Sequence, residues 1–194
     1  MATAGRGFGG GGGGRAARGK AGGPVVCVGE ALVDCISRQP AAAVAAVPEG
    51  GWEPQPGGAP ANVAAGVAKL GHAAAFVGGL GCDAAGERLA AELEAQGVAL
   101  RGAQRVEGAP TREVLVLQSE AGERSFAGFR NENGAHADCF LDANGLDLEL
   151  LREAATIVTG TLGLAYPAVS TRCGSARGGA RRTDGKGKQR RGRR

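Results

Sequence analysis

The stretch PGGAPANVAAGVAKLG at residues 56–71 joins a glycine-rich turn to a helical pattern and is the most informative part of the chain. Pro60 suits the first turn of a helix, and Gly71 can take the left-handed conformation that closes one. The sequence therefore predicts a helix over residues 60–70. At helical spacing its apolar face carries Val63, Val67 and Leu70.

Short apolar runs that suit buried strands lie on both sides of this helix, at residues 25–28, 76–80 and 156–158. Residues 31–37 either extend the first of these strands or pair beside it. Because such runs alternate with helical patterns, the sequence predicts an α/β fold with a mostly parallel sheet and flanking helices.

Two more helical patterns follow. Asp83 can cap a helix that runs to about Gln96, with Leu89 and Leu93 as its inner stripe. Residues 147–154 also have a helical pattern.

A hairpin is predicted from residues 111–118 and 124–130, which flank a loop with Gly122 placed for a positive φ. Its partial polar alternation suits a sheet with one wet face. We therefore expect this hairpin to form a flap on the α/β domain.

The charge of the chain divides it into three parts. The net charge is +4, yet residues 1–24 hold four Lys or Arg and no acid, and residues 171–194 hold ten against one Asp. Residues 25–170 therefore carry nine bases and eighteen acids, a net charge of -9. We expect a flexible Gly/Arg-rich leader at 1–24, one domain at 25–170 and a basic disordered tail at 171–194.

Several classes of protein are disfavoured by what the sequence does not contain. No apolar run approaches the roughly 20 residues that span a bilayer, and the N-terminus has no secretory h-region. The five cysteines form no C-x-x-C pair, and His72 and His136 are isolated, so no metal site is expected. A cytoplasmic location is predicted, with a plastid as the alternative because the leader is basic and free of acids.

Candidate binding residues gather around the turn that begins the first helix. The paired Gly57 and Gly58 let backbone approach a ligand, and Asn62 adds a donor and an acceptor beside free helix N–H groups. A sugar matches that mixture and an anion matches the N–H groups alone, whereas the alternative is an ordinary loop and cap. Asp34 follows the first strand, where it either accepts hydrogen bonds from two adjacent hydroxyls or is a surface turn residue.

A rival site is the string GLGCDA at residues 79–84, which fits the loose G-x-G-x-x-G/A dinucleotide fingerprint. The next strand candidate, residues 98–101, ends in Arg, with no acid for the ribose of NAD. The sequence therefore favours the first site.

Together these motifs resemble the N-terminal half of a ribokinase-like (PfkB-type) sugar kinase, and most closely a plant fructokinase. The strings that carry the resemblance are VVCVGEALVD at 25–34, PGGAPANVA at 56–64, LG at 70–71, GGLGCDAAG at 78–86 and FRN at 129–131. The resemblance covers about residues 25–167 and implies an incomplete ribokinase-like fold with a small β-hairpin lid near residues 111–130.

The resemblance also implies roles for particular residues. Asp34 would bind sugar hydroxyls, and Gly57, Gly58 and Asn62 would line the pocket. Arg130 would reach the sugar from the lid, with Arg124 as a second candidate. The other partner implied is a second copy of the chain, paired through the lid, and neither a membrane nor a specific nucleic acid is expected.

The reaction implied is transfer of the γ-phosphoryl group of MgATP to the 6-hydroxyl of fructose. The family supplies its catalytic base from a Gly-Ala-Gly-Asp turn that this sequence does not contain, and the only acid after Glu153 is Asp184. No catalytic residue is therefore assigned, the ATP site is expected to be largely missing, and the chain is predicted to be truncated and inactive. A retained intron or a changed reading frame is our hypothesis for residues 171–194. The alternatives are a non-catalytic fructokinase-like scaffold protein of plastid transcription complexes and, third, an RNA-binding tail.

Overall fold

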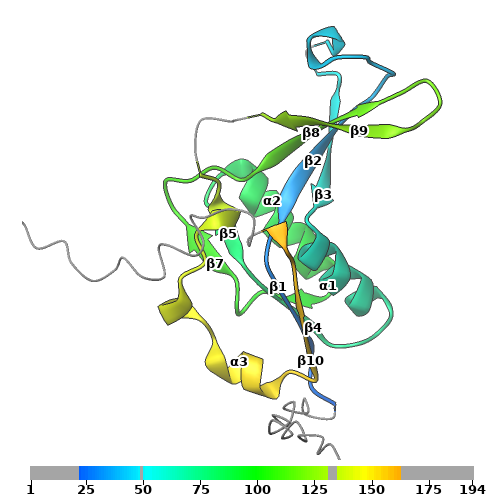
Figure 1. The fold of residues 1–194 in the computed structure, drawn as a ribbon. Helices are drawn as coiled ribbons and strands as arrows, with labels where there is room; N and C mark the ends of the chain where they lie inside the picture. Colours follow the sequence, from blue (N-terminus) through cyan, green and yellow to red (C-terminus); the bar gives the residue numbers. More distant parts are fainter. Residues whose placement is uncertain (1–21, 49, 131–134, 163–194) are drawn as a thin grey trace, which may run out of the picture.

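The computed structural model describes residues 22–48, 50–130 and 135–162 of the chain. The predicted leader and tail lie almost entirely outside these residues. Within them two four-stranded sheets and a two-stranded sheet are combined with three α-helices and three short 3-10 helices (Figure 1).

The first sheet, here called the core sheet, is parallel throughout and has the strand order β10-β1-β4-β6. Its strands are β1 (Val25–Val28), β4 (Ala74–Val77), β6 (Val98–Ala99) and β10 (Thr156–Thr159). It is flanked by α1 (Ala59–Lys69), α2 (Ala84–Ala95) and α3 (Leu148–Glu153). The predicted α/β class is confirmed by this arrangement.

The second sheet extends beyond the core sheet, as Figure 1 shows, and is here called the projecting sheet. Its order is β3-β2-β8-β9, with β2 and β8 parallel and both outer pairs antiparallel. The strands are β2 (Leu32–Ser37), β3 (Trp52–Gly57), β8 (Glu113–Gln118) and β9 (Arg124–Phe129). The predicted hairpin is therefore present as β8 and β9, but it forms half of a larger sheet.

The remaining elements are a third small sheet and three short 3-10 helices. A short parallel pair is formed by β5 (Gly79–Gly81) and β7 (Gln104–Val106). The 3-10 helices are η1 (Val44–Ala46), η2 (Ala137–Cys139) and η3 (Ala143–Gly145).

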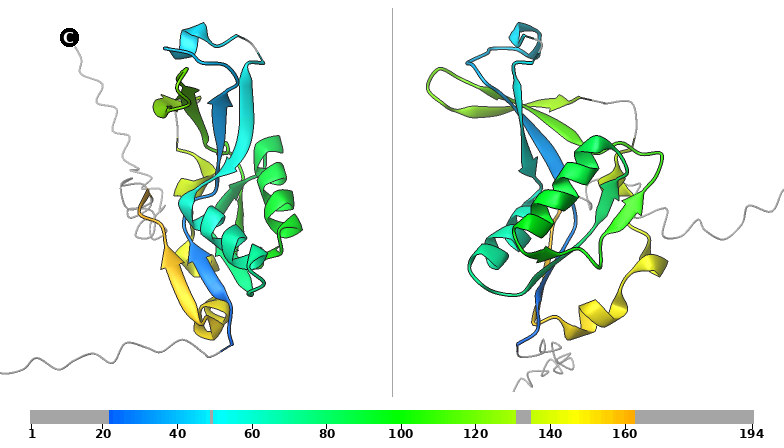
Figure 2. Two further views of the ribbon diagram at one scale, coloured as in Figure 1. Left: turned by 90° about the vertical axis from the view of Figure 1, so that its right-hand side faces the viewer. Right: turned by 180° about the vertical axis from the view of Figure 1, so that it is seen from behind.

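The hydrophobic core lies on both faces of the core sheet, because side chains alternate along a strand. Cys27 and Phe76 face the side on which α1 and α2 pack. Val26 and Val77 face the other side and pack with Leu150 of α3. The two views in Figure 2 show α1 and α2 together on one side and α3 on the other.

The predicted apolar face of α1 is only partly correct, since Val67 packs against the core whereas Val63 and Leu70 do not. Val63 is 40% exposed and Leu70 is 79% exposed, whereas the buried residues of the helix are small: Pro60, Ala61, Ala64 and Ala65. Alanine at the contact lets the helix lie close to β1 and β4. Hydropathy alone predicts that the more apolar valine face packs against the sheet. Close packing instead favours the face with small alanine side chains.

Three strand predictions also need correction. Residues 76–80 are not one strand, since β4 and β5 belong to different sheets. Residues 31–37 neither extend β1 nor pair with it but enter the projecting sheet as β2. The predicted buried strand at 156–158 is β10, which lies at the end of the core sheet with Ile157 48% exposed.

The strand β3 was missed because Pro54 and Pro56 interrupt its pattern. Proline cannot donate to a sheet ladder, and it is tolerated where a strand lies at a sheet edge. In the part of the chain that the structure describes, β3 is such an edge strand.

Asp83 confirms the predicted cap of α2 and also holds the start of β8. Its Oδ1 accepts hydrogen bonds from the Gly86 N–H at 2.8 Å and the Thr111 hydroxyl at 2.6 Å, and Oδ2 accepts one from the Thr111 N–H at 2.7 Å. Burial alone would raise the pKa of Asp83, but these hydrogen bonds together lower it.

We predict that Asp83→Ala lowers the free energy of unfolding by about 1–3 kcal/mol, because a cap and two further hydrogen bonds are lost. A lowered folded-state pKa gives stability that is present above the unfolded pKa of about 3.9 and lost as the pH falls through the folded value. The difference between wild type and variant should therefore shrink below about pH 4.

Urea titrations at several pH values measure this difference, with the exposed Glu94→Ala on the same helix as the control. An equal difference between wild type and Asp83→Ala at pH 7 and pH 2.5 would contradict the ionic origin of the effect.

Candidate functional site

The chain passes from one sheet to the other at a close contact between two backbone segments. It leaves β1 through Gly29, Glu30 and Ala31 to enter β2, and it returns from β3 through Gly57 and Gly58 to begin α1 (Figure 1). Gly58 has a φ of 97°, and a Cβ there would lie 2.5 Å from the carbonyl oxygen of Glu30. Only glycine allows this approach, which holds the N-terminus of α1 beside the carboxyl end of β1.

Asp34 lies directly against Gly57. A Cβ on Gly57 would lie 2.6 Å from Asp34 Oδ2, so the carboxylate occupies the space that a side chain would fill. In β2 the residues Val33, Cys35 and Ser37 are buried on one face, while Asp34 lies half-buried on the other. The structure therefore brings together two of the predicted site residues at the junction of the sheets.

The electrostatic environment of Asp34 leaves its carboxylate available to a ligand. Burial raises its pKa, and the positive charge of Arg124 lowers it in part. Among the described residues no side chain or N–H donates a hydrogen bond to its carboxylate. A carboxylate in this position can accept hydrogen bonds from hydroxyl groups.

Asn62 lies in the first turn of α1 with its side chain exposed. It lines a cavity of about 310 Å³ between α1 and α2, together with Gln55, Gly57, Lys69 and Glu92. Gly57 therefore contacts both this cavity and Asp34, while Asn62 lies on the α2 side of the turn.

Arg130 is directed away from Asp34. Its Nε donates a hydrogen bond to Glu113 Oε2 at 2.5 Å, and its guanidinium lies 5.9 Å from the centre of the Trp52 ring. Glu113 also accepts a hydrogen bond from the thiol of Cys35 at 3.5 Å, and Cys35 is on the buried face of β2.

A β-bulge explains this orientation of Arg130. Val114 pairs with Phe129 and Val116 with Phe126, so β9 has one extra residue between the two pairs. Gly128 in this segment has a φ of 107°. An extra residue reverses the faces of the residues that follow. Arg124 therefore shares the face of Asp34, whereas Arg130 does not.

A buried ion pair that sequence reasoning missed lies next to the start of β8. Arg112 and Asp138 are 2% and 4% exposed and form two hydrogen bonds of 2.8 and 3.1 Å. The guanidinium of Arg112 also lies 5.0 Å from the centre of the Phe129 ring. Nothing in a single sequence marks these two residues, because they are 26 positions apart and each resembles a surface charge.

Glu30 is the other buried acid to which sequence reasoning gave no role. It is 7% exposed, and its Oε2 has no hydrogen-bond partner among the described residues. It lies at the close contact with Gly58 described above.

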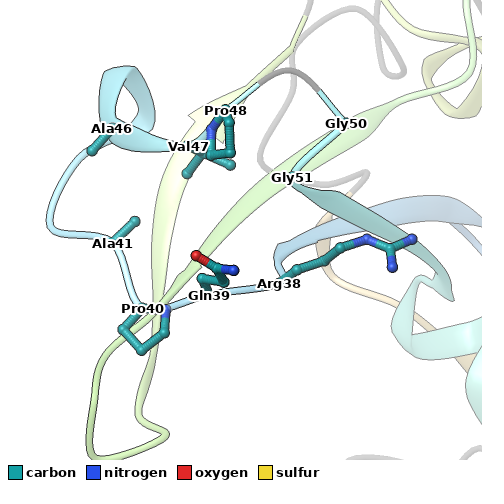
Figure 3. Close-up of a pocket in the computed structure, with 9 residues that line it drawn as sticks. All are labelled: Arg38, Gln39, Pro40, Ala41, Ala46, Val47, Pro48, Gly50 and Gly51. Atoms are coloured by element: carbon teal, nitrogen blue, oxygen red, sulfur yellow. The ribbon is translucent and has the colours of Figure 1, made fainter.

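A further cavity lies far from these residues, in the connection between β2 and β3. It has a volume of about 270 Å³ and is bordered by Arg38, Pro40, Val47 and neighbouring residues. Figure 3 shows that the side chain of Arg38 extends away from Ala41 and Ala46, and Arg38 is the only charged residue among the described residues that border this cavity. None of the predicted site residues lines this cavity.

Residues 22–48, 50–130 and 135–162 contain neither a metal-binding cluster nor a membrane-spanning helix. No group of three or more His, Cys, Asp or Glu residues there could hold a metal ion. No helix in the same residues is long and apolar enough to cross a membrane. Of the cysteines described, Cys27, Cys35 and Cys139 are buried free thiols and Cys82 is exposed.

The sequence pattern of the pfkB family of carbohydrate kinases matches residues 24–177. The chain belongs to the pfkB family of carbohydrate kinases. It is 41% identical over 140 residues to fructokinase-1 of Zea mays, covering 72% of this chain and 42% of that protein. It is 37% identical over 140 residues to the probable chloroplastic fructokinase-6 of Arabidopsis thaliana, covering 72% and 35%. This pfkB chain thus spans about two fifths of the length of these relatives.

Solved structures of sugar kinases support the assignment of this chain to the family. A sugar kinase of Pyrococcus horikoshii in complex with ATP matches with a TM-score of 0.66 and 32% identity, over 76% of this chain and 47% of that one. The fructokinase of Xylella fastidiosa matches with a TM-score of 0.60 and 33% identity, over 71% and 41%. The fold of this chain is therefore that of ribokinase-like sugar kinases.

We predict that Gly57→Ala lowers the free energy of unfolding by about 1–3 kcal/mol, because its methyl group would collide with Asp34 and with Leu32. The control is Gly66→Ala in α1, where an added Cβ meets no atom within 4 Å. That substitution should stabilise the chain by up to about 1 kcal/mol through helix propensity. Urea unfolding of both variants checks the prediction, and an equal effect of the two alanines would contradict it.

Proposed function

We propose that this chain carries the sugar-binding part of a fructokinase-like enzyme, with Asp34 as the main acceptor for sugar hydroxyls. The observation that carries the proposal is the carboxylate of Asp34, partly buried against Gly57 at the junction of the two sheets. Fructose is the proposed sugar because matched plant relatives are named fructokinases.

The geometry suits a neutral ligand that has several hydroxyl groups. Asp34 offers acceptors, and the start of α1 beside Gly58 offers N–H donors. Asn62 adds a polar side chain on the other side of the turn. In this proposal Gly57 and Gly58 line the pocket beside Asp34, and Asn62 lines the adjoining cavity between α1 and α2.

The projecting sheet is the proposed lid over this pocket. Its face that carries Asp34 also carries Arg124 and Phe126, which is 65% exposed. Arg124 is the cation better placed to reach a ligand, whereas Arg130 would first have to leave Glu113. A lid that excludes water protects a phosphoryl group in transfer from hydrolysis.

In this proposal the described residues do not hold MgATP. The sequence contains no Gly-Ala-Gly-Asp turn, and the described residues contain no acidic cluster for a metal ion. We therefore assign no step of phosphoryl transfer to this chain. We propose that the 194-residue chain binds the sugar without turning it over.

The purified chain, incubated with fructose and MgATP, should form no ADP above a control without protein. A full-length plant fructokinase in the same coupled assay is the positive control. Fructose-dependent ADP formation by the chain would contradict the proposed absence of activity.

Asp34→Asn should weaken fructose binding at least tenfold, since a hydrogen bond to a charged acceptor is lost. Its free energy of unfolding at pH 7 should be equal to or above that of wild type, because burial disfavours the ionised form in the folded state. Isothermal titration and urea unfolding measure the two effects, with the exposed loop variant Glu120→Gln as the control. Unchanged affinity would refute the role of Asp34.

The raised pKa of Asp34 also predicts a pH dependence. As the pH falls through the folded-state value, Asp34 takes up a proton and wild-type affinity for fructose should fall. This loss should begin at a higher pH than the value of about 3.9 expected for an exposed aspartate. Asp34→Asn should show no such step.

A further inference from the structure

Glu30 carries a buried carboxylate oxygen for which the described residues provide no donor. The residue lies two positions after the end of β1, and it is 7% exposed. Its Oε2 is fully buried without a hydrogen-bond partner among those residues. Buried polar atoms nearly always have a partner, so this one points to a donor that is not part of the described chain.

The carboxylate lies where three segments of the chain meet. A Cβ on Gly160 would lie 2.5 Å from Glu30 Oε2 and 2.6 Å from Pro60 Cγ. A Cβ on Gly29 would lie 2.7 Å from the same Pro60 atom. Glu30 Oε2 is therefore held at the carboxyl ends of β1 and β10 and beside the N-terminus of α1.

This position is the usual location of ligands in open α/β sheets, which bind outside the carboxyl ends of the strands. Gly160 leaves the space that the carboxylate occupies. Burying an unpaired carboxylate is costly, and an apolar side chain of similar size would avoid that cost. A hydrogen-bond donor on a bound ligand would offset this cost.

Glu30 and Asp34 both adjoin the same turn. The Asp34 carboxylate lies against Gly57, and the Glu30 backbone lies against Gly58. Two carboxylates around one turn favour hydroxyl donors and disfavour anions. The site therefore suits an unphosphorylated sugar better than a sugar phosphate.

We propose that Glu30 is a specificity-determining residue whose Oε2 accepts a hydrogen bond from one hydroxyl group of the bound sugar. This inference rests on the proposed function. It adds a second carboxylate to the sugar site and excludes the phosphorylated product by charge.

The test compares wild type with Glu30→Gln, which keeps the shape of the side chain and removes its charge. Isothermal titration with fructose should show an affinity loss of about ten- to a hundredfold for Glu30→Gln. A panel of fructose analogues that each lack one hydroxyl identifies the group contacted. For one of these analogues wild type and Glu30→Gln should bind equally.

The control is Glu94→Gln, an exposed position on α2, which should bind every sugar like wild type. Glu30→Asp keeps the charge but shortens the side chain, so it should lose the same single hydroxyl contact. Circular dichroism shows whether Glu30→Gln folds. If it does not fold, Glu30→Asp is used for the same comparison.

The outcomes separate the two proposals. If wild type does not bind fructose, the proposed function of the chain fails. If wild type binds and the Glu30 variants weaken all analogues equally, or weaken none, Glu30 has only a structural role and the inference is overturned.

Discussion

The structure depends on one close approach of backbone to backbone, between Gly58 and the segment of Glu30 and Ala31. A side chain at position 58 would lie 2.5 Å from the Glu30 carbonyl oxygen, so this contact exists only with glycine. It joins the exit of β1 to the entry of α1, and it fixes the point where the chain changes sheets. The helix start and the two acids are placed by this single contact.

Asp34 and Glu30 lie at this junction in environments that are unfavourable for a carboxylate, so the rest of the fold must offset the cost of burying them. Burial disfavours the ionised form of Asp34, and Glu30 has a buried carboxylate oxygen without a described partner. Elsewhere acids of the same fold are fully engaged: Asp83 accepts three hydrogen bonds and Asp138 pairs with Arg112. The contrast between satisfied and unsatisfied carboxylates separates structural acids from candidate ligand-binding ones.

Sequence patterns predicted the features that depend on local chemistry. Asp83 was recognised as a cap because its position before a helical stripe is sufficient, and β8 and β9 because their alternation is local. Features that depend on distant contacts were not predicted. The alanine face of α1 is chosen by its fit to β1 and β4, and the direction of Arg130 is set by a bulge that only pairing reveals. Asp34 and Gly57 were both proposed for the site, although their mutual contact required the strand register.

The buried pair of Arg112 and Asp138 has a consequence for how such sequences can change over time. Removing one member leaves the other charge stranded in the interior, at a cost of about 3–5 kcal/mol, whereas exchanging both for well-packed apolar residues is often neutral. We therefore expect substitutions at these two positions to occur together, because either single substitution passes through a less stable protein.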